Sequence, residues 1–148
     1  MATSRATTLQ NWSRLPSLAA PGSSGLDTRT KIRPSSDSVG PRAGSVIAKG
    51  WFDVLTADHC RALADAKQPD GSLLVLVFKE TAAHPTPLDA NDRAQLVAGL
   101  ACVDEVVICD ESEADALISK WQAGVAVDIE ALVKRDVVKD VIASQRSE

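Results

Sequence analysis

Apolar and polar positions follow a regular pattern only from about residue 44 onward. Val46-Ile47-Ala48 is a short apolar run that stops at a turn-forming Lys49-Gly50, and residues 73–78 form a continuous apolar run. Runs of this kind are typical of buried strands in a parallel sheet. Between them, a helix is predicted from a cap at Thr56 or Asp58 to Lys67, where Pro-Asp-Gly follows. The first part of this region is therefore predicted as strand, helix, strand.

The same alternation continues toward the C-terminus. A helix is predicted from Asp89 to Leu100, with Asp89 as its cap, and a strand from Glu105 to Ile108. Further elements are a helix opened by Ser112 and Asp115 and running to Trp121, a strand over 125–127 and a closing helix over 129–144. Alternating strands and helices predict an α/β fold for residues 44–148: a Rossmann-like three-layer parallel sheet with helices on both faces.

Residues 1–43 differ in composition from this region. They are rich in Ser, Thr, Pro and Gly and lack apolar positions at a spacing that would bury one face. We therefore expect a disordered tail. Two alternatives remain open: an organellar targeting segment, because the stretch is Arg-rich and Leu9, Trp12 and Leu15 fit one helical face, or a docking peptide.

Charge is distributed unevenly between the two parts. The chain has 16 Lys and Arg against 20 Asp and Glu, but residues 1–43 hold six of the basic residues and only two of the acidic ones. The rest of the chain is strongly acidic, which argues against a nucleic-acid surface, whereas a small phosphorylated molecule needs only a local positive site.

The cysteines and the hydropathy of the chain indicate the cellular environment of the protein. The three cysteines show no CxxC spacing, so free buried thiols are expected, with neither disulfides nor a metal site. No apolar run approaches the roughly 18 residues that cross a bilayer. We expect a cytoplasmic protein with no membrane contact.

The first strand-to-helix connection, Gly50 to His59, is the predicted ligand site. In open parallel sheets, ligands bind beyond the carboxyl ends of the strands. His59 falls in the first turn of the predicted helix, where free N–H groups and the helix dipole favour an anion such as a phosphate. His59 is therefore a candidate phosphate-binding residue. The alternative is an exposed first-turn histidine beside an Asp58 cap.

This connection, Gly-Trp-Phe-Asp-Val-Leu-Thr-Ala-Asp-His, resembles the G-x-F-D and His-x-Gly-His blocks of the cytidylyltransferase-like nucleotidyltransferases. A second block, from Asp92-Arg93 to Val103-Asp104-Glu105-Val106, is similar to another block of the same family. The resemblance spans roughly residues 46–127 and is strongest to heptose-phosphate adenylyltransferase and glycerol-phosphate cytidylyltransferase domains.

The resemblance implies nucleotidyl transfer from ATP or CTP to a sugar- or polyol-phosphate, with pyrophosphate release and Mg²⁺ assistance, and homodimers are common in the family. Such chemistry depends on positioning and charge stabilisation. His59 matches the second histidine of the family element and is the candidate catalytic residue, Arg93 matches a ligand-site arginine, and Gly50 allows close approach of a nucleotide. Phe52 and Asp53 shape the same loop. Lys49, which precedes Gly50 and could bind phosphate, and Thr56 complete the candidate binding residues.

The chain departs from the family pattern at several positions. Thr56 stands where the family has its first histidine, and Asp58 replaces the glycine. Only Lys79 could substitute for a later Lys-Gly, and the late Ile-Ser-Ser/Thr-Thr element is not recognisable before Glu148. A catalytically inactive descendant that binds a nucleotide or a partner is therefore the alternative function. An unrelated doubly wound domain, such as a flavodoxin-like receiver, is a third.

For several residues, a purely structural or solvent-exposed role remains an alternative. Arg93 could form a surface ion pair with Asp89 or Asp92, and Lys49 could be a solvated strand end. His84 is expected in a solvated loop. Trp51 and Trp121 are expected to pack at the edge of the core.

Overall fold

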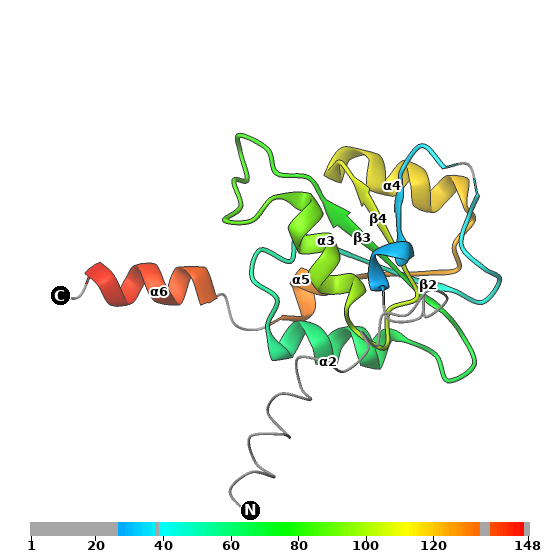
Figure 1. The fold of residues 1–148 in the computed structure, drawn as a ribbon, viewed down its shortest axis with the longest axis horizontal. Coiled ribbons are helices and arrows are strands. Elements are labelled where there is room, and N and C mark those ends of the chain that lie inside the picture. Colours follow the sequence, from blue (N-terminus) through cyan, green and yellow to red (C-terminus); the bar gives the residue numbers. More distant parts are fainter. Residues whose placement is uncertain (1–26, 38, 134–136, 147–148) are drawn as a thin grey trace, which may run out of the picture.

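The computed structural model describes residues 27–37, 39–133 and 137–146. These residues form a parallel sheet in the order β1-β4-β3-β2-β5 (Figure 1). The strands are β1 (Ile32–Pro34), β2 (Val46–Gly50), β3 (Leu73–Phe78), β4 (Glu105–Cys109) and β5 (Val125–Asp128). The helices are the 3-10 helix η2 (Thr28–Lys31), α2 (Ala57–Ala66), α3 (Ala90–Ala98), α4 (Glu111–Lys120), α5 (Ile129–Leu132) and α6 (Val137–Arg146). The predicted Rossmann-like α/β architecture is confirmed.

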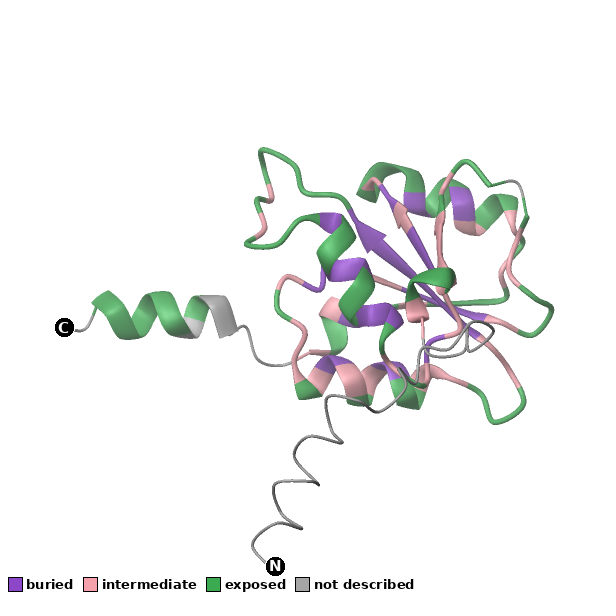
Figure 2. Cartoon of the chain, viewed as in Figure 1, coloured by how far each residue is buried: buried purple, intermediate pink, exposed green. Residues whose placement is uncertain are grey.

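Two apolar cores lie on the two faces of the sheet, because side chains alternate between faces along each strand. In β3, Leu73, Val75 and Val77 pack with α2, α3 and α5, whereas Leu74, Leu76 and Phe78 pack with α4. All six β3 residues are buried, as the purple central strands of Figure 2 show. The continuous apolar run was therefore interpreted correctly as a strand covered on both faces.

Side-chain caps set the starts of the helices. Asp89 caps α3 by accepting a hydrogen bond from the Asp92 amide at 2.8 Å, as predicted. Thr56 is the N-cap of α2. The predicted start of α4 at Ser112 is wrong, because Asp110 is the cap and pairs with Glu113 in a capping box. Asp110 directly follows β4, so its carboxylate lies beside the free N–H groups of the first turn of α4 and caps them.

Two predicted element ends differ from the structure. Strand β2 continues through Gly50, where a turn was predicted, since Lys49 and Gly50 pair with Leu76 and Val77 of β3. The single closing helix predicted over 129–144 is also wrong, because α5 ends at Leu132 and the extended backbone of Val133 follows. Residues 134–136 lie outside the described part. Leu132, Val141 and Ile142 are about half exposed, so their helical spacing marks no buried face.

Strand β1 lies within the stretch predicted as tail. It pairs in parallel with β4, from Ile32 opposite Val106 to Pro34 opposite Ile108. The ordered sheet therefore begins before residue 44. A three-residue strand is too short to show a period of two, and its proline suits only an edge position. Residues 1–26, with the proposed targeting face of Leu9, Trp12 and Leu15, lie outside the described residues.

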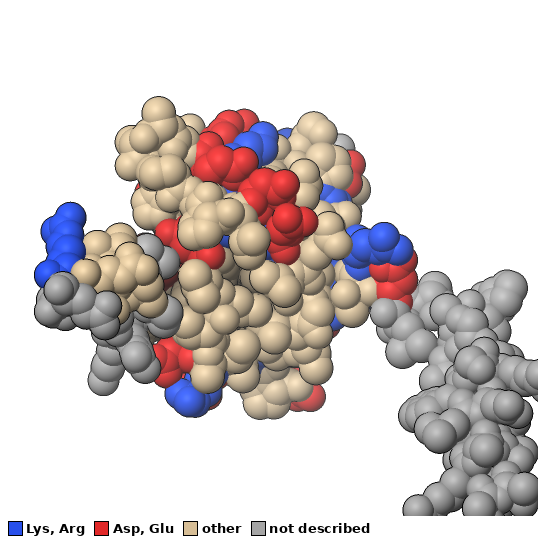
Figure 3. Space-filling model, turned by 60° about the vertical axis from the view of Figure 1, so that its left-hand side comes forward, with Lys and Arg blue, Asp and Glu red and all other residues tan. Residues whose placement is uncertain are grey.

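Surface charge agrees with the prediction of an acidic domain, whereas the prediction of buried thiols holds only for Cys109, because Cys60 and Cys102 are partly exposed. Acidic side chains group on the face drawn in Figure 3, whereas Lys and Arg of the described residues lie in separate spots. The three cysteines are free, and burial raises the pKa of the Cys109 thiol to about 12. Within the ranges that the structure describes, no helix has the length and apolar character needed to cross a membrane.

Candidate functional site

Gly50 ends β2 at a point where the chain passes very close to Glu130, the second residue of α5. A Cβ on Gly50 would lie 3.1 Å from Glu130 Oε1 and 3.2 Å from Phe52 Cε2, both closer than ordinary contacts. A side chain at residue 50 would therefore require both neighbouring side chains to shift by a few tenths of an ångström. The resemblance implied close approach of a nucleotide at Gly50, whereas in this structure the neighbouring group is a carboxylate of the chain itself.

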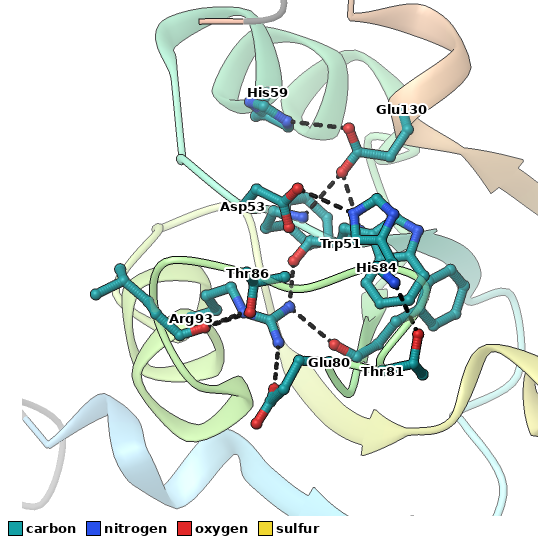
Figure 4. Close-up of polar contacts among 12 residues, drawn as sticks. Trp51, Asp53, His59, Glu80, Thr81, His84, Thr86, Arg93 and Glu130 are labelled. Carbon is teal, nitrogen blue, oxygen red and sulfur yellow. Dashed lines mark hydrogen bonds and ion pairs between the residues drawn. The ribbon is translucent and has the colours of Figure 1, made fainter. Parts of the chain in front are cut away.

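The Glu130 carboxylate is bound by two successive backbone amides. Trp51 N and Phe52 N both donate to Oε1, each at 2.9 Å (Figure 4). Phe52 itself has φ of 51°, in the left-handed region that is common in anion-binding turns. Consecutive N–H groups arranged around one point form a nest, an arrangement that binds anions. The β2–α2 connection therefore contains an anion site, and Glu130 fills it.

His59 faces the same carboxylate from the first turn of α2. Its side chain is buried, and Nε2 lies 3.5 Å from Glu130 Oε2. Nδ1 accepts from the Thr56 amide at 3.1 Å and lies 2.8 Å from the Thr56 hydroxyl. Because Nδ1 is an acceptor, the ring proton lies on Nε2, the atom directed at Glu130. The alternative of an exposed His59 is wrong, and Thr56 acts as a helix cap.

The electrostatics of this cluster favour the ionised form of Glu130. Burial alone would raise the pKa of Glu130, but the contact with His59 and the hydrogen bonds from Phe52 and Trp51 together hold the pKa below its ordinary value of 4.5. The folded state therefore prefers the carboxylate over the acid. The site therefore holds a partly exposed carboxylate with two amide hydrogen bonds on Oε1, and with His59 Nε2 3.5 Å from Oε2.

We expect the stability of the protein to depend on Glu130 below about pH 4.5. A carboxyl group with a depressed pKa stabilises the fold above its unfolded pKa, and that contribution is lost as the pH falls through the folded pKa. Urea unfolding at pH 6 and pH 3.5 should show a larger loss of stability for the wild type than for Glu130→Gln. Equal losses in the two proteins would contradict the assigned role of the carboxylate.

Arg93 is fully buried in α3 and donates to four groups of the chain. Nε donates to Leu88 O at 3.0 Å, and Nη1 donates to Trp51 O at 2.5 Å and Phe78 O at 2.8 Å. Nη2 donates to Glu80 at 2.9 Å. The guanidinium thus joins the ends of β2 and β3 to the loop before α3. Its donors are directed at the protein rather than at a ligand.

The surface alternative for Arg93 is also wrong, because its partner is Glu80 and neither Asp89 nor Asp92. Lys49 points toward α4 instead, with Nζ 3.3 Å from the Asp115 carboxylate. The structure therefore does not bring the three predicted site residues, His59, Arg93 and Lys49, to one point. Asp58, which replaces the family glycine, pairs with Arg61 at 2.7 Å.

A second polar group covers the β2–α2 connection from the loop after β3. His84 stacks on Trp51 with ring centroids 3.8 Å apart and 13° between the planes, and its Nε2 lies 3.0 Å from Asp53 Oδ2. The other oxygen, Asp53 Oδ1, is buried without a hydrogen-bond partner. His84 lies in an exposed loop, as predicted, and its side chain is 41% exposed, although its ring has the specific partners Trp51 and Asp53. Trp51 and Trp121 pack against the α4 core as expected.

Three contributors to the site were missed: Glu130, His84 and Glu80. Glu130 could have been suspected from the sequence, because it closely follows the predicted strand 125–127. In this sheet that strand lies directly beside β2, so its carboxyl end is next to the β2–α2 connection. His84 and Glu80 lie in a loop whose path no local pattern indicates.

Comparison with known proteins places the chain in a family. Residues 47–146 match the cytidylyltransferase-like family model, so the chain belongs to this family. The bifunctional protein HldE of Campylobacter curvus is 36% identical over 108 residues, which cover 65% of this chain and 23% of that protein. The FAD synthase of Archaeoglobus profundus is 31% identical over 71 residues, 46% of each chain. The chain thus spans about a quarter of HldE.

A solved structure is also similar. The lipopolysaccharide core biosynthesis protein of Thermoplasma volcanium aligns with a TM-score of 0.43 and 25% identity, covering 62% of this chain and 98% of that one.

Proposed function

We propose that this domain binds a nucleoside triphosphate, ATP or CTP, with one phosphate group at the position of the Glu130 carboxylate. The observation that carries the proposal is that Trp51 N and Phe52 N donate to one carboxylate, while His59 Nε2, buried and without a hydrogen-bond partner, lies 3.5 Å from the same group. A phosphate oxygen is an acceptor of the same kind and charge. Membership of the cytidylyltransferase-like family supports a nucleotide as the molecule that carries this phosphate.

Binding requires that Glu130 leave the nest. Its side chain is 35% exposed, so it has a short path to solvent, and it belongs to a helix of only four residues. The vacated donors then serve the phosphate. The affinity of the wild type for nucleotide is therefore lowered by an internal competitor, and a nucleotide-binding module with little turnover is the function that this geometry supports best.

We expect low turnover because the other side chains that could donate to the transferred phosphate interact with groups of the chain itself. Thr56 caps α2, Arg93 is used by four chain groups, and Lys49 pairs with Asp115. Loss of one transition-state donor costs roughly 2.7–4 kcal/mol, or about a hundred- to a thousand-fold in rate. With three such groups engaged elsewhere, we expect transfer chemistry to be very slow.

Transfer to a sugar- or polyol-phosphate is the second candidate, favoured by the proton on His59 Nε2 directed at the anion position. An acceptor phosphate oxygen would attack the α-phosphorus, the bond from that phosphorus to the bridging oxygen would break, and pyrophosphate would leave. His59 would stabilise charge on the phosphoryl oxygens.

The resemblance also implies Mg²⁺. Among the described residues, no group of three or more His, Cys, Asp or Glu side chains could hold a metal ion. Mg²⁺ that arrives with a triphosphate needs only one or two carboxylates besides phosphate oxygens and water. Asp53, with its buried and unpartnered Oδ1, is the side chain that fits this need. The metal would neutralise phosphate charge.

Thermal-shift titrations of the full chain with ATP, CTP, ADP and CMP, with and without Mg²⁺, test the proposal. We expect Glu130→Gln and Glu130→Ala to bind a triphosphate at least about tenfold more tightly than the wild type, because a charged competitor with hydrogen bonds worth about 1.5–3 kcal/mol is weakened or removed. Glu111→Gln, at an exposed carboxylate in the first turn of α4, is the matched control and should bind like the wild type.

A folded Glu130→Ala protein that no nucleotide stabilises would refute the proposed site. Pyrophosphate release is measured in parallel with glycerol 3-phosphate and with sugar phosphates. No release above background is expected from the wild type. Release that depends on an added phosphate ester would favour the second candidate.

A further inference from the structure

The loop between β3 and α3, residues 79–89, reaches the β2–α2 connection without being part of the core. Its residues are exposed except His84 and Thr86, which are partly buried, and Figure 2 draws the loop mostly in green. Among the described residues, neither apolar core includes a residue of this loop. Hydrogen bonds, ion pairs and ring contacts therefore hold the loop in place.

Arg93 fixes the two ends of this loop. Its Nη2 donates to Glu80 at 2.9 Å, and its Nε donates to Leu88 O at 3.0 Å. Between these ends, the backbones of Thr81 and His84 donate hydrogen bonds to each other, at 3.2 Å and 3.1 Å. The segment between the two fixed ends thus has a turn of its own.

His84 joins the middle of the loop to the rest of the domain. Its ring stacks on Trp51 with centroids 3.8 Å apart, and its Nε2 donates to Asp53 Oδ2 at 3.0 Å (Figure 4). Within the described part of the chain, His84 supplies the hydrogen bond and the ring contact that join residues 81–87 to the β2–α2 connection. One side chain therefore holds this segment against the domain.

The closed arrangement of this segment leaves one polar atom unsatisfied. Asp53 Oδ1 is buried without a hydrogen-bond partner, whereas water would reach it if the segment moved away. A buried acceptor without a donor costs free energy, which offsets much of what one hydrogen bond and one ring stack contribute. The closed arrangement is therefore favoured only modestly over an open one.

We propose that residues 81–87 form a lid, which His84 holds closed over the β2–α2 connection and which opens to admit a ligand. The closed lid covers the ring of Trp51, whose backbone N–H is one of the two that bind Glu130. Opening exposes this ring and the Asp53 carboxylate beside the nest. Control of nucleotide entry by the lid rests on the proposed function, but closure of the lid does not.

NMR of the full chain with labelled histidine tests whether the lid is closed. The chain has two histidines, so the signal that disappears in His84→Gln belongs to His84. We expect its ring protons to lie upfield of those of free histidine, because they stack on the Trp51 ring. Ring protons of His84 at the free-histidine position would overturn the lid.

Cleavage of the full chain by subtilisin within residues 81–87 tests how the lid is held. Cleavage follows the population of the open form, so we expect His84→Ala to be cut about tenfold faster than the wild type. His84→Phe keeps a stacking ring without the donor, and His84→Gln keeps a donor without the ring, so both should be cut at intermediate rates. Lys79→Ala, at an exposed side chain of the same loop, is the matched control. Equal cleavage of the wild type and His84→Ala would contradict the role of His84.

ATP titrations of Glu130→Gln, with and without His84→Ala, test control of nucleotide entry. A lid that is open in about a tenth of the molecules lowers the apparent affinity about tenfold, so the double variant should bind ATP about tenfold more tightly. Equal affinity of the two proteins would overturn this control. If neither protein binds ATP while the NMR and cleavage results are as expected, the proposed function fails and the lid stands.

Discussion

Replacing Arg93 by alanine is expected to lower the free energy of unfolding by about 3–5 kcal/mol, the typical cost of breaking a buried ionic network. The variant leaves the carbonyls of Trp51, Phe78 and Leu88 without their donor in a buried environment. Unpaired buried acceptors cost more than the hydrogen bonds themselves contribute. Urea denaturation of the full chain, followed by fluorescence, measures the change.

Two control variants separate this role from charge alone. Arg93→Lys keeps the charge but cannot reproduce a planar fork that reaches four acceptors, so we expect it to remain strongly destabilised. Arg61→Ala removes an arginine from the exposed pair with Asp58 and should cost less than about 1 kcal/mol. A small loss in Arg93→Ala, comparable to that in Arg61→Ala, would show that Arg93 does not hold the strand ends together.

The predictable part of this fold is the part that local patterns encode. Residues 73–78 and 105–108 were recognised as strands because their apolar runs have the length and β-branched content of buried strands. The helices 57–66 and 90–98 carry caps and spacing that are likewise local. In contrast, β1 forms by pairing with the edge of β4, and a three-residue segment has no local pattern that predicts this pairing.

The candidate site shows the same division. Resemblance to family blocks located the segment from Gly50 to His59, and the structure places an anion-binding nest there. It could not reveal that Glu130, far along the chain, occupies the nest. The buried state of Arg93 was equally hidden, because its four acceptors come from different loops and strand ends. Contacts between distant residues depend on packing, which a local pattern does not specify.

Phe52 offers a test of how the β2–α2 connection is built. It is buried at 1% exposure and packs in the core with α2 and α5, although the resemblance implied a place in the nucleotide loop. Phe52→Ala is expected to lose about 3–5 kcal/mol of unfolding free energy, the usual cost of deleting a buried aromatic ring. Urea or thermal unfolding of the full chain measures this loss.

The backbone at this position predicts an unusual order of stabilities. With φ at 51°, an alanine at residue 52 is strained, whereas glycine adopts this conformation without cost. Phe52→Gly should therefore be about 1 kcal/mol more stable than Phe52→Ala, although it deletes more atoms. At Leu63, which is equally buried but lies inside α2, glycine should be about 1 kcal/mol worse than alanine. If glycine were the worse choice at both positions, the left-handed conformation of Phe52 would be wrong.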